Sequence, residues 1–388
     1  MDIKIGLKEI CSFLPLLHNV ASIKKEDRNG LLYSMDYTGD YYRLLPVLDG
    51  IFDAGCTVFA HKTPAGEMLL GRNYDLRHIY HDPETGTEEM TGLITVLRSQ
   101  GGKAGYASIG ICDAVWLDPN CRIFRRGSFD HKDKNTLRAL MLPFLTMDGV
   151  NEKGLAVSIL HLTTDNSFEE TDYTDPATLS EKEKKDLVLL NAPGEVPDKM
   201  NGRLTKRSII INPCDRRTWK VIKGQSARQT EPGKRSVPHT VLMRMMLDSC
   251  ANCAEAVALA RTVNIRSLPE SDYHIMVTDP DRSVILEWIG SRLTVEECFH
   301  AANFYNNRAD HFGYGYDRDD ILKTAIDKNP DGISEEDCMK ALEKASQNCL
   351  AGKDLGFTQW SAVYNLNRQS IRLALHTDYK QLYTFSLK

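Results

Sequence analysis

The chain has 388 residues, of which 42% are apolar and 26% are charged. These proportions are typical of a globular protein with a sizeable core, which excludes a disordered, collagen-like or disulfide-dense small protein. No stretch of about 18 uncharged apolar residues occurs, so we expect no membrane span. The net charge of -5 provides no overall field that would attract nucleic acid.

The ten cysteines are scattered along the sequence without the spacing of a disulfide framework. Reduced thiols of this kind are typical of the cytosol, where disulfides are rare. The start of the sequence also lacks a secretory pattern, because the apolar run 13–17 is short and no small-residue cleavage site follows it. The sequence therefore predicts a cytoplasmic protein.

Residues 1–55 differ in pattern from the rest of the chain. Apolar residues recur at helical spacing in 5–20 and again in 42–51, and the charged stretch 24–30 lies between them. This pattern predicts a small, mostly helical leader that ends immediately before Cys56.

From Cys56 onward the pattern changes to that of strands. Two short runs, 56–61 and 68–73, flank a Lys-Thr-Pro-Ala-Gly turn, which predicts a hairpin. Further strands are expected at 92–97, 106–112, 155–162, 274–278, 284–289, 362–366, 371–376 and 382–387. Helices are expected at 136–144, 238–247, 253–263, 319–327 and 334–347, the last with Ser334 as its N-cap. Strands with apolar residues on both faces, combined with helices and no fixed repeat, favour one layered α+β domain.

Residues 180–237 form a basic stretch, with 14 Lys and Arg against 7 Asp and Glu. A site for single-stranded nucleic acid would need aromatic side chains on which bases stack, and Trp219 is the only aromatic residue in this stretch. We therefore expect a solvated surface excursion and no nucleic-acid partner.

Cys56 is the first candidate for chemistry, because it stands at the junction between the leader and the strands. A free cysteine is most often a buried core residue, but here Gly55 precedes it and leaves its own carbonyl open to attack. Cleavage of the Gly55–Cys56 bond would give Cys56 a free α-amine. Such an amine titrates at roughly 7.7–8.0, so one residue could supply both the nucleophile and its base.

Arg72 and Asp75 lie on the second strand of the predicted hairpin, which folds them back toward Cys56. A guanidinium near sulfur favours the thiolate, and a carboxylate can hold an ammonium group in place. An ordinary surface ion pair is the alternative for these two residues.

Cys56-Thr57 and the segment Gly-Arg-Asn-Tyr-Asp at 71–75 together resemble the choloylglycine hydrolase and penicillin V acylase family. These enzymes are linear-amide C–N hydrolases of the N-terminal nucleophile class. Further segments match the family in order, namely 148–155, 273–279, 283–288, 301–304, 313–318 and 358–363. The leader departs from bile-salt hydrolases, which lose only an initiator methionine, and is similar to that of the self-cleaving acid ceramidase and N-acylethanolamine amidase branch.

The resemblance implies a four-layer αββα sandwich of two antiparallel sheets. Residues 56–388 would form the amidohydrolase domain and residues 1–55 an autocleaved propeptide. The substrate would be a small N-acyl amide, and apolar residues after the first strands suggest a fatty, aryl or steroid acyl half. The resemblance implies neither a metal nor a cofactor.

The resemblance also implies roles for the site residues. Cys56 would attack the amide carbonyl, Asp75 would orient its α-amine, and Arg72 would set the field around the sulfur. Arg318 would complete this field around the carboxylate. The side-chain amide of Asn303, with Asn151 assisting, would donate to the oxyanion.

Two alternatives to a hydrolase remain open at this point. An acyltransferase would pass the same thioester to an amine instead of water. A binding or scaffolding protein of the same fold would keep Cys56 internal and never be cleaved. The sequence also leaves a homo-oligomer open.

Overall fold

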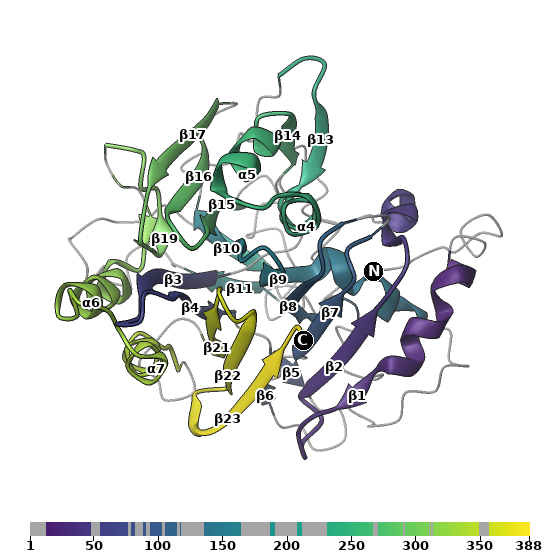
Figure 1. Cartoon of the computed structure of the whole chain (residues 1–388), viewed down its shortest axis with the longest axis horizontal. Coiled ribbons are helices and arrows are strands. Elements are labelled where there is room, and N and C mark those ends of the chain that lie inside the picture. Colours follow the sequence, from purple (N-terminus) through teal and green to yellow (C-terminus); the bar gives the residue numbers. More distant parts are fainter. Residues whose placement is uncertain are drawn as a thin grey trace.

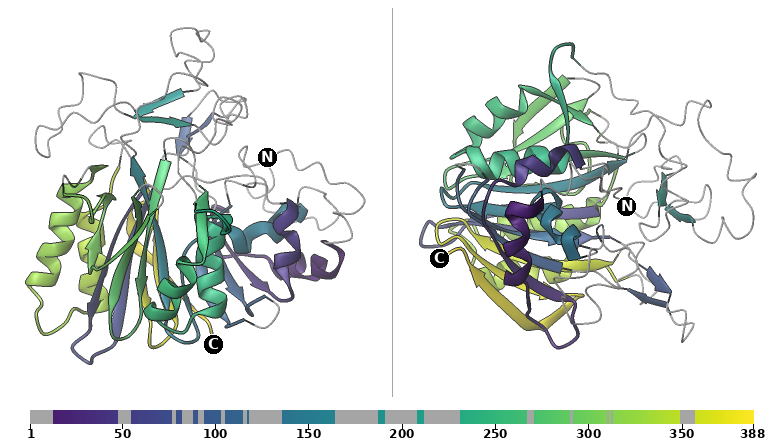
Figure 2. Two further views of the ribbon diagram at one scale, coloured as in Figure 1. Left: turned by 90° about the horizontal axis from the view of Figure 1, so that it is seen from above. Right: turned by 90° about the vertical axis from the view of Figure 1, so that its right-hand side faces the viewer.

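The computed structural model describes residues 13–47, 55–76, 79–81, 88–90, 94–102, 105–114, 117, 136–163, 187–190, 208–211, 231–266, 271–289, 292–309, 311, 313–348 and 357–388. Two large sheets pack against each other, and helices cover their outer faces (Figures 1 and 2). No helix within the described residues is long and apolar enough to cross a membrane.

The larger sheet has nine strands in the order β1-β2-β7-β8-β9-β10-β15-β16-β17. These strands are β1 (Lys24–Lys25), β2 (Leu32–Tyr37), β7 (Ile94–Ser99), β8 (Ser108–Asp113), β9 (Thr146–Asn151), β10 (Ala156–Thr163), β15 (Ser271–Thr278), β16 (Ser283–Ile289) and β17 (Arg292–Glu297). All neighbours pair antiparallel except β2 and β7, which pair in parallel. Helices α4 (His239–Ser249) and α5 (Cys253–Ala260) cover the outer face of this sheet.

The smaller sheet has six strands in the order β18-β3-β4-β21-β22-β23. These strands are β18 (His300–Ala301), β3 (Gly55–Lys62), β4 (Met68–Asp75), β21 (Thr358–Asn365), β22 (Ser370–Leu375) and β23 (Asp378–Ser386). Helices α6 (Tyr316–Asp327) and α7 (Glu335–Lys344) cover its outer face. The expected N-cap at Ser334 is confirmed, since its side chain accepts from the Asp337 amide at 3.1 Å.

Four further strand pairs lie outside the two large sheets: β5 (Ile79–His81) with β6 (Glu88–Met90), β11 (Leu187–Leu190) with β12 (Ser208–Ile211), β13 (Arg235–Pro238) with β14 (Val263–Arg266), and β19 (Asn303–Phe304) with β20 (Gly313–Tyr314). Three 3-10 helices complete the described structure: η1 (Leu14–Ser22), η2 (Tyr41–Val47) and η4 (Thr136–Leu145).

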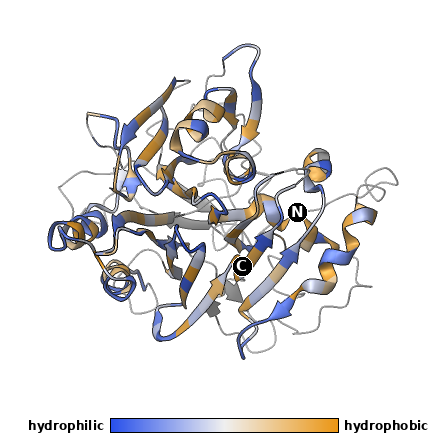
Figure 3. Cartoon of the chain, in the orientation of Figure 1, coloured by the Kyte–Doolittle hydropathy of each residue, from blue (hydrophilic) through white to orange (hydrophobic). Residues whose placement is uncertain are grey.

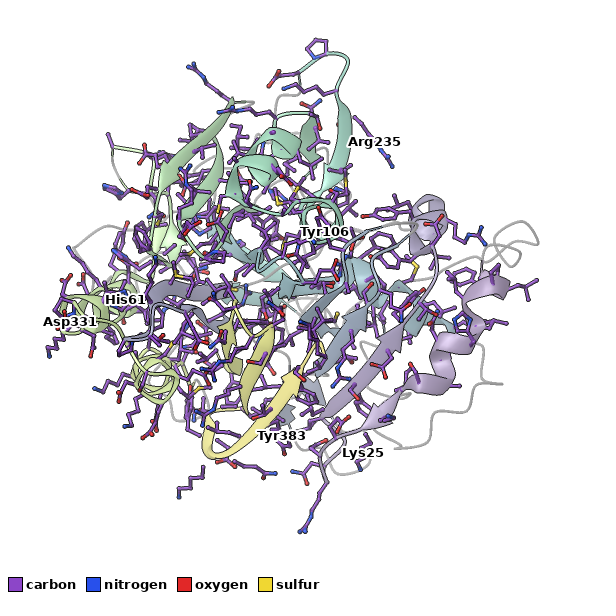
Figure 4. The ribbon with its side chains drawn as sticks, viewed as in Figure 1. Lys25, His61, Tyr106, Arg235, Asp331 and Tyr383 are labelled. Atoms are coloured by element: carbon purple, nitrogen blue, oxygen red, sulfur yellow. The ribbon has the colours of Figure 1, made fainter. Side chains whose placement is uncertain are left out.

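Alternation along β3 and β4 explains the layers. Val58 and Leu70 join the main apolar core between the two sheets, whereas Phe59 and Leu69 join a second core beneath α6 and α7. Successive side chains of a strand point to opposite faces. Because both faces of β3 and β4 meet an apolar core, each strand needs apolar residues on both faces. Figure 3 shows hydrophobic residues along the strands and hydrophilic colours over much of α6 and α7, while Figure 4 shows side chains filling the space between the layers.

The hairpin that carries the site is anchored at its far end. The ring of His61, near the end of β3, makes a 2.7 Å hydrogen bond through Nε2 with the carbonyl of Asn329, in the connection between α6 and α7 (Figure 4). This bond fixes one end of β3 against the outer helices, and Cys56 lies at the other end.

The predicted four-layer αββα sandwich is confirmed by this packing, with one correction. The larger sheet is mixed rather than purely antiparallel, because β2 enters it from residues 1–55 beside β7. The strands of the β3–β4 hairpin lie between β2 and β7 in the chain but belong to the other sheet. The path from β2 to β7 is therefore a crossover, which permits parallel pairing.

In its described residues 13–47, the leader is part helix and part strand. The 3-10 helices η1 and η2 overlap the two stretches of helical spacing, and the strands β1 and β2, which were not predicted, lie between them; every residue of β2 except Asp36 is buried. In β2 the large residues Tyr33, Met35 and Tyr37 alternate with Ser34 and Asp36, which is the two-residue period of a strand and differs from the helical period on either side of it. The helix expected at 136–144 is 3-10 in form over Thr136–Leu145 and contains Pro143.

Polar contacts tie the leader to the rest of the protein. The hydroxyl groups of Tyr41 and Tyr42 donate to Asp248 on α4, at 2.5 and 2.8 Å. The same carboxylate accepts from Arg244, which is also buried, at 2.5 Å. Tyr37, at the end of β2, donates to the carbonyl of Leu140 at 2.9 Å. Residues 13–47, the described part of the leader, therefore contribute to the core of the protein.

Candidate active site

Cys56 lies at the start of β3, with its side chain fully buried between the sheets. The β3–β4 register pairs Cys56 with Tyr74. On β4, Asp75 is the residue after Tyr74, and Arg72 lies two residues before it. Arg72 Nη2 donates to Cys56 Sγ at 2.5 Å. The hairpin therefore brings the predicted arginine to the predicted nucleophile.

Arg72 is held by groups from the facing sheet. Its Nε lies 2.9 Å from Asp148 Oδ2, and both side chains are fully buried. Its Nη1 donates to the carbonyl of Met147 at 3.0 Å and to the hydroxyl of Ser158. These contacts prevent the guanidinium of Arg72 from turning away. Its positive charge is therefore held beside the sulfur of Cys56.

Burial and charge act in opposite directions on the thiol. Burial raises the pKa of Cys56 to about 12, against the positive charge of Arg72, which lowers it. The carboxylates of Asp75 and Asp148 add to the rise. In the uncleaved chain the thiol is therefore protonated at neutral pH, and an attack by sulfur needs a base.

Asp75 belongs to a second buried group centred on Arg318. Arg318 Nη1 donates to Asp75 Oδ2 at 2.8 Å, to Thr57 Oγ1 at 2.8 Å and to the Cys56 carbonyl at 3.2 Å. The other oxygen of Asp75 accepts from Thr358 Oγ1 at 2.5 Å. The carboxylate thus lies beside the backbone of the residue whose amine would be freed by cleavage.

Asn303 completes the group on the other side of Arg318. Arg318 Nη2 donates to Asn303 Oδ1 at 2.7 Å, which turns the amide nitrogen of Asn303 away from the guanidinium. That nitrogen donates to the carbonyl of His161 at 2.8 Å. An amide nitrogen carries two N–H groups, so one donor is used in this contact and the other can serve a ligand.

Asn151 does not belong to this site, and the prediction that it assists the oxyanion is corrected. Its Nδ2 donates to the carbonyls of Leu247 and Cys250, at the end of α4, at 3.0 and 2.8 Å. Its Oδ1 accepts the amides of Lys153 and Leu155, both at 3.0 Å. The side chain closes the turn after β9 and fixes α4 to it.

The alternation of β9 explains this difference. Residues three apart on a strand point to opposite faces. Asp148 faces Arg72, whereas a side chain at Gly149, on the same face as Asn151, would lie 3.2 Å from Leu247 of α4. The segment 148–155 therefore does reach the site, but through Asp148.

Four residues of the site were missed by sequence reasoning: Asp148, Ser158, His161 and Thr358. The signal for Asp148 was an acid inside a buried strand, where an unpaired carboxylate would be costly. The other three offered no signal, because serine, threonine and histidine in apolar strands are common. Within the described residues, no group of three or more His, Cys, Asp or Glu side chains could hold a metal ion.

Asp148 also has partners beyond Arg72. It accepts from Trp360 Nε1 at 3.3 Å and from the hydroxyl of Tyr364, both on β21. The ring of Trp360 stacks on that of Tyr74, with centroids 3.9 Å apart and an interplanar angle of 11°. The carboxylate, once desolvated, is therefore supported by an ion pair and two neutral donors, as a buried charge requires.

Comparison with known proteins gives distant likenesses. No family model matches the sequence, and no curated protein matches it either. Two solved structures of conjugated bile acid hydrolase from Clostridium perfringens are similar, both of variants of that enzyme, one at 12% identity and a TM-score of 0.46 and the other at 13% and 0.45. They cover 85% and 86% of this chain, and 92% of theirs.

Penicillin V acylase from Agrobacterium tumefaciens is similar at 11% identity and a TM-score of 0.46, covering 85% of this chain and 86% of that one. These three structures are thus of a bile acid hydrolase and of a penicillin V acylase. At such distances, the functional argument rests on the contacts of the site itself.

The two asparagines give a matched test of the site. If Asn303 is the oxyanion donor that the sequence predicts, Asn303→Ala should lower kcat by about 10²–10³ with little change in KM. Asn151→Ala should instead lower the melting temperature and leave kcat per folded molecule unchanged, because its four hydrogen bonds all hold backbone groups. The checks are calorimetry and single-turnover kinetics. A loss of kcat in folded Asn151→Ala would return this residue to the site.

Proposed function

We propose that the protein is a self-activating cysteine amidohydrolase that cleaves the linear C–N amide bond of a small N-acyl compound. The observation that carries this proposal is the position of Cys56. Its sulfur is held by Arg72, and its backbone lies beside the Asp75–Arg318–Asn303 group. Nucleophile, amine holder and oxyanion donor therefore converge on one residue at the start of a strand.

Activation would break the bond between Gly55 and Cys56. The sulfur attacks the Gly55 carbonyl carbon, the C–N bond breaks, and the nitrogen of Cys56 leaves as an amine carrying the former thiol proton. Water then hydrolyses the thioester, which gives a carboxylate at Gly55 and a free thiol at Cys56. No external reagent except water is consumed.

Turnover would repeat this chemistry on an external amide. The new α-amine takes the proton of the thiol as the sulfur attacks the carbonyl, and returns it to the leaving amine. Asp75 holds the resulting ammonium, and the second N–H of Asn303 donates to the oxyanion. Water then releases the acyl group from Cys56.

The acyl half of the substrate is proposed to be apolar, and the amine half to retain a carboxylate or sulfonate. The basic stretch 180–237 would attract the negative charge of this amine half. Most of the stretch lies outside the described residues. A panel of N-acyl glycines, taurines and ethanolamines of varied chain length tests this, scored by amine release. Equal kcat/KM for all chain lengths, or cleavage of peptides alone, would contradict the proposal.

The same panel separates the two open alternatives. Added hydroxylamine should compete with water for the acyl group if an acyl-thioester forms on Cys56. A product that forms only in the presence of an added amine would identify an acyltransferase. No amine release and no acylation of Cys56 by any member of the panel would favour a binding protein.

Self-cleavage is tested by the intact mass of the purified protein. We expect fragments 1–55 and 56–388 to form without added protease, and Cys56→Ala to stay full length. The two fragments should elute together from a sizing column, because β2 and Tyr41 bury the leader in the core. Cleavage that persists in Cys56→Ala would show that another protease makes the cut.

The pH dependence of self-cleavage follows from the raised pKa of the buried thiol. Since that pKa is about 12 in the uncleaved chain, the thiolate fraction rises about tenfold with each pH unit below it. The first-order rate of cleavage should therefore increase from pH 6 to pH 9, measured by gel densitometry of freshly refolded precursor. Cys338→Ala, in the core beneath α6 and α7, is the control and should cleave like the wild type. A rate that rises as the pH falls would show that an acid, and not the thiolate, limits the step.

A further inference from the structure

We propose that His274 and Glu287, which form a buried cross-strand pair, position Asn303 for its role at the oxyanion. This inference rests on the proposed function, because it concerns the same site. Neither residue touches Cys56 in the described structure, so both would act through the backbone on either side of Asn303 and are positioning residues.

The pair lies on neighbouring strands of the larger sheet. His274 on β15 stands directly opposite Glu287 on β16, and both side chains are fully buried. His274 Nδ1 lies 2.9 Å from Glu287 Oε1. Two ionisable groups buried together are costly unless their remaining polar atoms also find partners. Those partners lie on the segment that carries Asn303.

His274 fixes the residue before Asn303. Its Nε2 makes a 2.8 Å hydrogen bond with the carbonyl of Ala302. The Ala302 carbonyl and the Glu287 carboxylate both accept, so each ring nitrogen donates one hydrogen bond, Nε2 to Ala302 and Nδ1 to Glu287. The orientation of the ring by Glu287 thus determines where the donor to Ala302 points.

Glu287 fixes the residues after Asn303. Its Oε1 accepts the backbone amide of Asn306 and its Oε2 that of Asn307, each at 2.8 Å. Amide hydrogen bonds to a carboxylate are stronger than those between neutral groups. Asn307 is held further through Thr294 Oγ1, which accepts from Asn307 Nδ2 at 2.9 Å and donates to the Glu287 carbonyl at 3.0 Å.

Asn303 lies between these two fixed points. The strand on which it stands, β19, has two residues and pairs only with the two residues of β20. So short a ladder defines the backbone weakly, and the bonds to Ala302, Asn306 and Asn307 add to the contacts that the Asn303 side chain makes with Arg318 and His161. A displacement of about 1 Å at a catalytic group can cost about a hundredfold in rate, so the pair affects the reaction without contacting it.

If the pair only stabilised the fold, its effect on kcat would not depend on Asn303. A double-mutant cycle therefore separates a positioning role from a purely stabilising one. If the pair acts through Asn303, Glu287→Gln should lower kcat about tenfold or more with KM little changed. The same substitution should cost nothing further in Asn303→Ala, where no donor remains to be positioned. An equal fractional loss of kcat in both backgrounds would overturn the proposal.

Thr278→Val provides the matched control. Thr278 lies on the same hairpin, is fully buried and shares a 2.8 Å hydrogen bond with Ser283, which joins the two strands of the hairpin to each other and not to the segment 302–307. This variant should lower the melting temperature and leave kcat unchanged in both backgrounds. Should Glu287→Gln fail to fold, Glu287→Asp keeps the charge but draws it back by one methylene, and the same non-additive loss is expected.

A structural measurement keeps this test distinct from that of the proposed function. If the wild-type protein releases amine from no member of the panel, the proposed function falls. A crystal structure of Glu287→Gln then still reports the Asn303 Nδ2 to His161 O distance, which is 2.8 Å in the unaltered chain. A lengthened or broken contact supports positioning, and an unchanged one overturns it.

Discussion

Arg318 joins the parts of the site that the two sheets and the outer helix bring together. One guanidinium nitrogen reaches Cys56, Thr57 and Asp75, and the other reaches Asn303. The arginine comes from the first turn of α6, so this helix does more than cover the smaller sheet. Its planar fork of donors is suited to such a junction, since it sets several acceptors at fixed angles to each other.

The site balances its buried charges in two pairs. Arg72 with Asp148 stands on one side of Cys56, and Arg318 with Asp75 on the other. In each pair one partner comes from the β3–β4 hairpin and the other from a different part of the fold. A buried ion that loses its partner is strongly destabilising. The chemistry and the packing of the sheets therefore depend on the same contacts.

The sequence predicted the layered fold, which is confirmed, and five residues that the structure brings together: Cys56, Arg72, Asp75, Asn303 and Arg318. Arg72 and Asp75 followed from a hairpin and a spacing, while Arg318 and Asn303 followed from a resemblance. The assignment of Asn151 failed because the sequence does not state which face of β9 meets the other sheet. That choice depends on packing against α4, which involves residues about a hundred positions away.

The leader shows a second limit of local signals. Its helical periodicity matches the two 3-10 helices, but the strand β2 between them was not predicted, although Tyr33, Met35 and Tyr37 alternate with Ser34 and Asp36. Its partner β7 lies about sixty residues further along the chain. The sequence of neither strand alone shows that β2 pairs with β7.

The parallel pairing of β2 with β7 has a consequence for how the protein can be produced. Without residues 1–55, the apolar strand β7 would become the edge of the larger sheet, with its backbone amides and carbonyls open to other chains. Long exposed edges of this kind promote edge-to-edge aggregation. The strand β2 therefore covers this edge of the sheet, and residues 56–388 expressed alone should aggregate even with Cys56 already at their start.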